Sequence, residues 1–313
     1  MKKLEKEALV ADREEVARIL DTIPEDDVLG RMSFESRMAE IEESLRTLDA
    51  ARTMIGQVAL LFGGAPTHGS RSIDATFASS VLKTYQELIS KRIATEEVGE
   101  LGARGPIPLH AQTSLAITDV VRGSVGFVLE EVTINDTLAE TAVKHAIDDI
   151  TGIIRGAASE QDDDFERAVE SLAPRVLMSL KDFFVTLDEG DATLRIVDDA
   201  HDQALDSNAI RRGRRRVEAT EIEEHPNEVV IGRILGLFPH ARRFEIQLEN
   251  GEVIHGTVSS GVSPRYHRLI ADRETNPVGR VWRILMNVRV VRELNRPERT
   301  VYNLVGLLAE VPD

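Results

Sequence analysis

The chain has 313 residues, enough for two or three domains, and its 42% hydrophobic and 29% charged residues match the average of folded proteins, which excludes disorder over most of its length. It contains no cysteine, which excludes disulfides, thiolate zinc sites, iron–sulfur clusters and thiol nucleophiles. The formal net charge is −16, but residues 229–313 hold twelve arginines, no lysine and nine acidic residues, so this part is basic and residues 1–228 are strongly acidic.

This uneven charge suggests that the two parts meet different partners, or that they meet each other. No segment approaches about 18 uninterrupted apolar residues, and the first residues lack the apolar run of a signal peptide. A cysteine-free chain also suits a reducing compartment. We therefore expect a cytoplasmic protein that does not bind membranes.

Two amphipathic helices are predicted at the start of the chain, in residues 1–53. Residues 4–23 place apolar side chains on one stripe, and a polar connection follows them. Ser33 is the expected N-cap of the second helix. In that helix apolar residues recur at spacings of four and three, namely at Phe34, Met38, Ile41, Leu45 and Leu48. This αα-hairpin either covers the core of its own protein, which the pattern favours, or serves as a dimerisation or partner-docking arm.

Residues 54–200 predict a mixed α+β domain whose topology the pattern leaves open. Residues 56–64 form an apolar run closed by two glycines, as expected of a buried strand. A helix capped by Ser72 follows, and then a β-hairpin that reverses at Arg122 and Gly123. Three helices and a last strand complete the domain, over residues 138–154, 165–172, 174–187 and 192–197.

An arginine-rich connecting helix and a linker are predicted in residues 201–227. In residues 209–220, small and apolar residues cluster on one side of a helix. The arginines on the opposite side are Arg211, Arg212, Arg214, Arg215 and Arg216. Such a row of arginines could bind phosphates. However, four glutamates follow directly in the sequence and would partly cancel its charge. The pattern therefore favours an ion pair between Arg214 and Glu218, or docking of the helix onto the acidic N-terminal part. Residues 223–228 cluster charge, a proline and an asparagine, and indicate a domain boundary.

Residues 228–313 alternate apolar and polar side chains and predict a five-stranded, OB-like small β-barrel. The expected strands cover residues 229–238, 242–248, 252–258, 279–291 and 299–308. Asn250 and Gly251 signal a tight hairpin between the second and third strands. One short helix is expected within residues 264–274, ahead of the fourth strand. This likeness rests on pattern alone and carries no function with it.

The predicted barrel offers a candidate binding face. If its first, second and fourth strands are neighbours, a basic strip on the outside is formed by Arg233, Arg243, Arg283 and Arg289. Nucleic-acid grooves on such folds combine arginines with exposed aromatic side chains on which bases stack. Alternation places Phe244 and Trp282 in the core, which leaves Tyr266, Tyr302 and Phe238 as stacking residues. With so little stacking support, the pattern favours solvated arginines or a protein interface.

Motifs of the common enzyme classes are absent. The sequence contains no phosphate-binding GxxxxGKS or GxxxxGKT loop, no dinucleotide-binding GxGxxG, no HExxH and no GxSxG, and no cofactor is expected. The nearest approach to a metal cluster is DDAHD, residues 198–202, in which Asp199, His201 and Asp202 are weak candidate ligands. The same letters suit the start of a helix with Asp199 as its cap, and this interpretation is favoured.

These observations predict a non-catalytic, cytoplasmic interaction protein. It would assemble a complex through its helical hairpin, central domain and barrel, with a protein partner or a second copy of itself. Two alternatives stay open. The first is a nucleic-acid-binding subunit of a larger machine that uses the arginine-rich helix and the basic face of the barrel. The second is a metal-dependent hydrolase that uses the cluster from Asp198 to Asp202.

Overall fold

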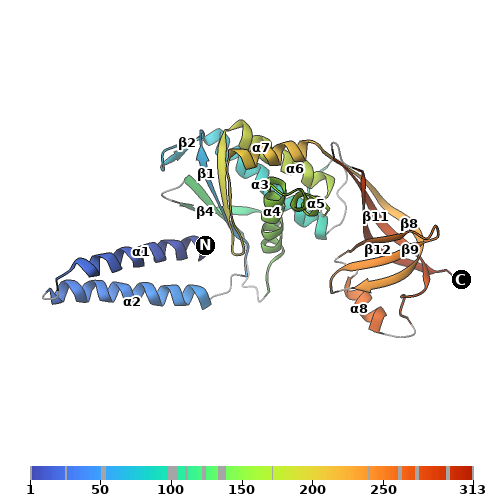
Figure 1. The fold of residues 1–313 in the computed structure, drawn as a ribbon, viewed down its shortest axis with the longest axis horizontal. Coiled ribbons are helices and arrows are strands. Elements are labelled where there is room, and N and C mark those ends of the chain that lie inside the picture. The colour runs from blue at the N-terminus through green and yellow to red at the C-terminus, as the bar shows by residue number, and fades with distance from the viewer. Residues whose placement is uncertain are drawn as a thin grey trace.

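The computed structural model combines eight helices, in its described part, with a mixed set of β-sheets (Figure 1). Figure 1 shows a helical hairpin at the N-terminal end, a central sheet covered by helices, and a closed barrel at the C-terminal end. Within the described ranges, every helix is too short or too polar to cross a bilayer. These ranges are residues 2–24, 27–50, 54–97, 105–109, 112–121, 125–132, 139–170, 172–238, 240–259, 263–271, 275–293 and 297–311.

The N-terminal hairpin consists of α1 (Lys2–Thr22) and α2 (Val28–Ala50), which pack against each other. Helix α2 begins before the expected cap at Ser33, which lies inside the helix. The reason is that Asp27 provides the cap: its carboxylate accepts a hydrogen bond from the Gly30 amide at 3.0 Å.

The start of α1 docks on the open face of the central sheet. Leu4 packs against apolar residues of that face, and Glu7 forms an ion pair with Arg195 at 2.7 Å. Farther along, Val16 of α1 and Ile41 of α2 are buried. From this attachment the hairpin extends away from the sheet (Figure 1).

The central sheet has the strand order β4-β5-β1-β6-β7, and each neighbouring pair is antiparallel. Its strands are β1 (Gln57–Gly64), β4 (Leu115–Val121), β5 (Val125–Glu131), β6 (Ala192–Val197) and β7 (Asp202–Leu205). Residues 58–62 of β1 are buried, as the apolar run predicted. The predicted hairpin is confirmed as β4 and β5, whereas Arg122 and Gly123 lie outside the described residues. A separate small sheet joins β2 (Thr67–His68) and β3 (Ser72–Ile73).

The sheet continues beyond the strand that was expected to be its last. β7 pairs with β6, so residues 198–202 connect two strands, and the predicted helix start with Asp199 as its cap is wrong. Leu205 is buried in the main core, which explains why this segment extends the sheet. The next helix is capped instead by Asp206, whose carboxylate accepts a hydrogen bond from the Ala209 amide at 2.7 Å.

Helices cover the other face of the sheet and enclose the main core (Figure 1). They are α3 (Ala75–Glu97), α4 (Ala142–Ala158), α5 (Asp162–Glu170), α6 (Pro174–Glu189) and α7 (Ser207–Glu218). The core joins alternate residues of β1, such as Leu60, to helix residues such as Ile150 and Phe183. Ser72 lies in β3 and does not cap α3; Asp74 does, because its carboxylate accepts the Phe77 amide at 2.7 Å.

The expected linker at residues 223–228 is part of a strand. β8 (Thr220–Phe238) runs through it and pairs with β11 (Val281–Glu293) along most of its length. Pro226 is tolerated because β11 has an irregularity opposite it, between Met286 and Val288, and because β9 pairs with β8 only beyond this point.

The stem, defined as the paired parts of β8, β11 and β12 (Arg299–Glu310) nearest the helices, packs onto the main core. Val291 is 2% exposed and belongs to that core, and Ile222 and Val301 pack against it. The barrel is therefore attached through continuous, partly buried strands.

The barrel is closed, with the strand order β10-β12-β11-β8-β9. It is completed by β9 (Arg243–Leu248) and β10 (Val253–Val258), and α8 (Ser263–Ala271) lies between β10 and β11. β10 and β12 are parallel, and the other neighbours are antiparallel. The five predicted strands and the short helix are thus present, with Gly251 at a positive φ of 85° in the predicted hairpin turn.

Candidate functional site

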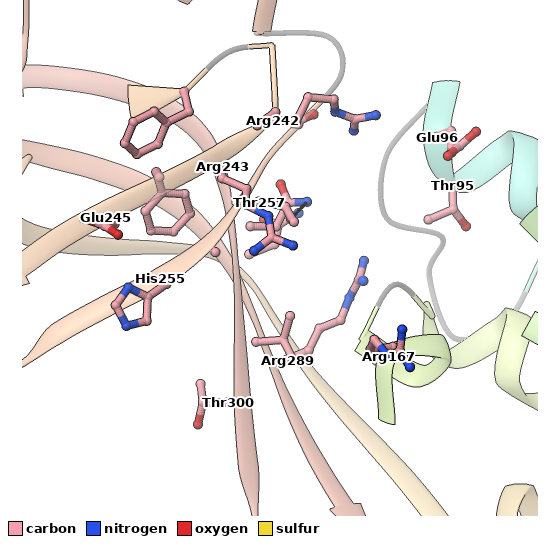
Figure 2. A pocket seen from close by; sticks show the side chains of 18 of the residues that line it. Thr95, Glu96, Arg167, Arg242, Arg243, Glu245, His255, Thr257, Arg289 and Thr300 are labelled. Atoms are coloured by element: carbon pink, nitrogen blue, oxygen red, sulfur yellow. Dashed lines mark hydrogen bonds between the residues drawn. The ribbon is translucent and has the colours of Figure 1, made fainter. Parts of the chain in front are cut away.

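A cleft of about 750 Å³ lies between the barrel and the helices α3 and α5. Figure 2 shows Arg242, Arg243 and Arg289 extending from the barrel toward the helices that carry Glu96 and Arg167. The charged groups of its lining are Arg92, Arg167, Arg242, Arg243, Arg289, Glu96 and Glu245. Arginines outnumber the acidic residues, so the cleft is basic although the chain as a whole carries a formal charge of −16.

Three of these arginines are already neutralised by acidic neighbours, among them Arg167, which pairs with Asp164 of α5 at 2.5 Å. Arg289 forms an ion pair with Glu224 of the stem at 2.8 Å, and both side chains are largely buried. Arg92 pairs with Glu96 and with Asp149, each at 2.9 Å. These groups shape the walls of the cleft and contribute little free charge to it.

Arg242 and Arg243 are exposed at the barrel side of the cleft. Arg242 Nε donates a hydrogen bond to the Val258 carbonyl oxygen at 3.2 Å, a contact that leaves its charge uncompensated. The Arg243 guanidinium forms no hydrogen bond or ion pair with any residue that the structure describes. A guanidinium group without an acidic partner has N–H donors that can bind an anionic ligand.

The four arginines predicted to form one strip fall into two groups. Arg243 and Arg289 line the cleft, whereas Arg233 and Arg283 are absent from its lining. The two groups are separated because β8 and β11 pair over a long distance. Arg283 lies opposite Ile231, in the barrel part of β8, whereas Arg289 lies opposite Glu224, in the stem. The Arg233 guanidinium donates to the Gly279 carbonyl oxygen at 2.6 Å.

The aromatic residues suggested for stacking also separate. Tyr266 of α8 is 2% exposed in the barrel core, where burial raises its pKa to about 12, so its prediction as a stacking residue is wrong. Helix α8, which carries Tyr266, packs on the core of the barrel, and alternation along the strands could not reveal this contact. Phe244 is in the core as predicted, and Trp282 packs against it. Phe238 is 51% exposed, lines the cleft, and lies opposite Arg243 on the neighbouring strand.

The arginine-rich helix α7 is docked on the central helices. Ala209, Ile210, Gly213 and Val217 form its buried side, as predicted. The predicted pair of Arg214 with Glu218 is present at 3.1 Å.

Three of the five arginines of α7 also bind other elements. Arg214 pairs with Asp188 of α6 at 2.9 Å, and Arg216 pairs with Asp162 of α5 at 2.5 Å. Arg212 Nε donates to the Ala158 carbonyl oxygen at 2.9 Å. Arg211 and Arg215 are the two exposed members, so most of the basic character of this helix is used inside the molecule.

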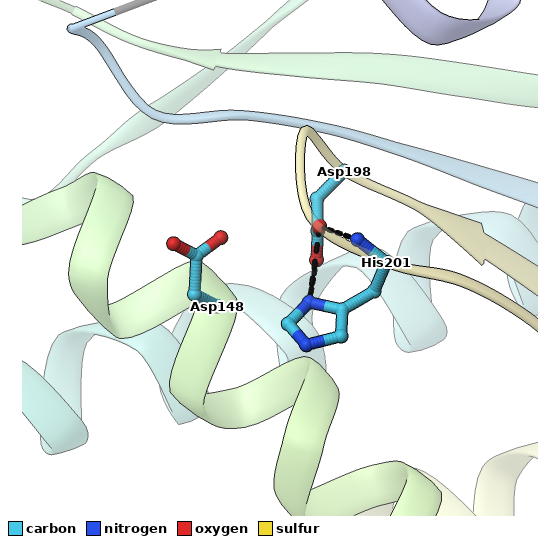
Figure 3. A group of neighbouring side chains, drawn as sticks. All are labelled: Asp148, Asp198 and His201. Carbon is cyan, nitrogen blue, oxygen red and sulfur yellow. Dashed lines mark hydrogen bonds and ion pairs between the residues drawn. The ribbon is translucent and has the colours of Figure 1, made fainter.

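A second group of polar residues lies in the central part, where α4 faces the connection after β6. Figure 3 shows Asp148 of α4 together with Asp198 and His201 of that connection. Each of the three residues has a potential ligand atom that lies within 4.8 Å of a potential ligand atom of the other two. Burial raises the pKa of Asp148, and the nearby Lys144 ammonium opposes that rise.

Of the three weak metal candidates from the sequence, His201 alone belongs to this group. Asp199 pairs with Lys144 at 3.2 Å, and Asp202 pairs with Arg195 at 2.7 Å. Asp148 was missed because it lies on a different element. The signal that could have found it is a stripe of polar residues at helical spacing in α4, namely Lys144, Asp148 and Thr151.

Comparisons with known proteins give no relative. No protein-family model matches this chain, and no curated protein or solved structure is significantly similar to it. A function is therefore inferred from the contacts, charges and burial of its own residues.

Proposed function

We propose that this chain is a cytoplasmic binding protein whose barrel holds single-stranded nucleic acid in the basic cleft. The observation that carries the proposal is the pair of exposed guanidinium groups, Arg242 and Arg243, beside the exposed ring of Phe238. Arginines that contact phosphates, with an aromatic face on which a base stacks, are the two elements of single-strand binding. The cysteine-free composition supports a reducing compartment.

The barrel topology supports the same proposal. In chain order its strands close as first, second, third, fifth and fourth, with the third and fifth parallel and a helix before the fourth. We take this arrangement as OB-like, a fold whose second and third strands and adjoining loops bind oligonucleotides or oligosaccharides. Residues from the second and third strands, β9 and β10, line the cleft, and among them Arg243, His255 and Thr257 are exposed. The arginines favour a phosphate-bearing ligand.

Fluorescence anisotropy with a labelled oligonucleotide of about 16 nucleotides tests this proposal. Arg243→Gln should weaken binding and make the slope of log affinity against log salt less negative by about 0.7, because one phosphate contact is lost. The matched control is Arg283→Gln, an exposed arginine of the same barrel outside the cleft, which should leave the slope unchanged.

The aromatic contribution is tested in the same assay. Phe238→Ala should cost about 1 to 3 kcal/mol of binding free energy, as expected for one stacked base. Leu235→Ala removes an exposed apolar side chain from the same strand outside the cleft and should have little effect. A wild-type chain that does not bind the oligonucleotide at low salt, or equal losses for Arg243→Gln and Arg283→Gln, would overturn the proposal.

Protein interaction, the function predicted from the sequence, is a second candidate because of one observation. At the far end of the hairpin, Val28, Leu29 and Met32 are exposed, Leu29 by 82%. We propose that this apolar tip contacts a second copy of the chain. Leu29→Lys should then lower the molar mass measured by light scattering, and a monomeric wild-type chain would contradict this role.

A further inference from the structure

The polar group in the central part carries more negative charge than its neighbours compensate. Asp198 is 1% exposed and Lys144 is 8% exposed, so both are buried. Lys144 is committed to Asp199 at 3.2 Å. The carboxylate of Asp148, which is half-buried, forms no hydrogen bond or ion pair with the residues that the structure describes. Buried charge is costly unless it is paired or coordinates a metal, and His201, which contacts Asp198, compensates it only when protonated, so this group can accept a positive ion.

Two buried hydroxyl groups at the same place have no hydrogen-bond partner of normal geometry among the described residues. They are the Tyr85 hydroxyl of α3 and the Thr151 hydroxyl of α4, and both side chains are almost completely inaccessible. The Tyr85 hydroxyl lies within electrostatic reach of Asp198 and Asp148: burial raises its pKa, these two carboxylates raise it further, and the neighbouring Thr151 hydroxyl lowers it. Two neighbouring buried hydroxyls without a hydrogen bond of normal geometry are rare in folded proteins, which points to an unseen partner beside them.

Asp198 and His201 contact each other directly, and their ligand atoms are close enough to bind one ion. His201 Nδ1 lies 3.1 Å from each oxygen of the Asp198 carboxylate. Two ligands on a metal with bonds of about 2.0 to 2.2 Å are about 3 Å apart in octahedral coordination and about 3.4 Å apart in the tetrahedral coordination typical of Zn²⁺. The Ala200 amide donates to the same carboxylate at 2.8 Å and fixes its orientation. Asp148 faces this pair across the gap (Figure 3), and rotation of its side chain would bring it into the coordination sphere.

We propose that Asp148, Asp198 and His201 bind one divalent transition-metal ion. An imidazole with two carboxylates suits Zn²⁺ or Mn²⁺ better than Ca²⁺ or Mg²⁺, which take oxygen ligands. The ion supplies a positive charge, and a water bound to it supplies a hydrogen-bond partner for Tyr85 and Thr151. This site lies in the central part, between α4 and the β6–β7 connection, and the proposal does not depend on nucleic-acid binding at the barrel.

Isothermal titration calorimetry of the full chain, freed of metal with a chelator, tests this site with Zn²⁺ and Mn²⁺. The wild-type chain should bind one ion, and binding should raise its thermal unfolding midpoint. Asp148→Asn and His201→Gln should each weaken the affinity at least tenfold. Circular dichroism of the metal-free variants confirms that they are folded.

Two neighbours on α4 serve as matched controls. Asp149→Asn alters the adjacent carboxylate, which pairs with Arg92, and His145→Gln removes an exposed histidine of the same helix. Both should retain wild-type affinity. Absence of saturable binding of either ion to the wild-type chain would overturn the proposal, and would mean that protons neutralise the cluster. Equal loss of affinity in the control variants would also overturn it, because binding would then be at the surface.

Discussion

Replacement of Val291 by alanine should destabilise the chain because this side chain joins the stem to the main core. Val291 is 2% exposed and belongs to the core of the central part, although it lies on a barrel strand. The substitution removes two methyl groups, each worth about 0.8 kcal/mol of burial, and leaves a cavity. The expected loss in the free energy of unfolding is about 2 kcal/mol.

The matched control is Val290→Ala, at the adjacent and less buried position. Both substitutions change strand propensity equally, so the difference between them reports packing alone. Urea unfolding followed by circular dichroism measures it, and Val290→Ala should cost less than about 1 kcal/mol. Strict alternation from Trp282 would instead place Val290 inward. An equal or larger loss for Val290→Ala would refute the packing of the stem onto the core.

Two further predictions concern stability. Gly152→Ala should stabilise the chain by up to about 1 kcal/mol, because a methyl group there meets open space in α4. Gly213→Ala should instead destabilise the chain by about 1 to 2 kcal/mol, because a methyl group at this position of α7 collides with the buried Phe184 ring. If thermal unfolding showed that both glycine variants are stabilised, this contact would be contradicted. The third prediction concerns the dependence of stability on acidic pH. A hydrogen bond from Arg292 holds the pKa of the Glu223 carboxyl below its ordinary value. Their ion pair therefore stabilises the folded chain above a pH of about 4.3, and this stabilisation is lost as the pH falls through the pKa of Glu223 in the folded chain. The Glu223→Gln variant should therefore lose less stability on acidification than the wild-type chain. The control variant Glu228→Gln, at an exposed position of the same strand, should lose as much stability as the wild type. Identical curves of unfolding free energy against pH for Glu223→Gln and the wild type would contradict the pairing.

The sequence predicted correctly those elements whose apolar and polar side chains alternate with a regular helix or strand period. The hairpin turn at Asn250 and Gly251, the alternation in β9 and the amphipathic character of α7 each follow from neighbours within a few residues. The pair of Arg214 with Glu218 belongs to the same class, because one helical turn separates the two residues.

Features that depend on a partner strand or helix were missed. Pro226 marks a break in sequence terms, yet β8 continues through it because β11 accommodates the irregularity. Tyr266 is a core residue because α8 packs on the core of the barrel. The same limit applies to the proposed metal site, where Asp148 and Asp198 are far apart in sequence and meet only when α4 lies beside the connection that follows β6.

Photo-crosslinking with a single-stranded oligonucleotide that carries 4-thiouridine tests the central claim most directly. The full chain is irradiated in complex with the oligonucleotide, and mass spectrometry then identifies the attached peptide. We expect the crosslink on the segment from Phe238 to Arg243, at the barrel side of the cleft. Crosslinks confined to Arg211 and Arg215, the exposed arginines of α7, would contradict the cleft as the binding site.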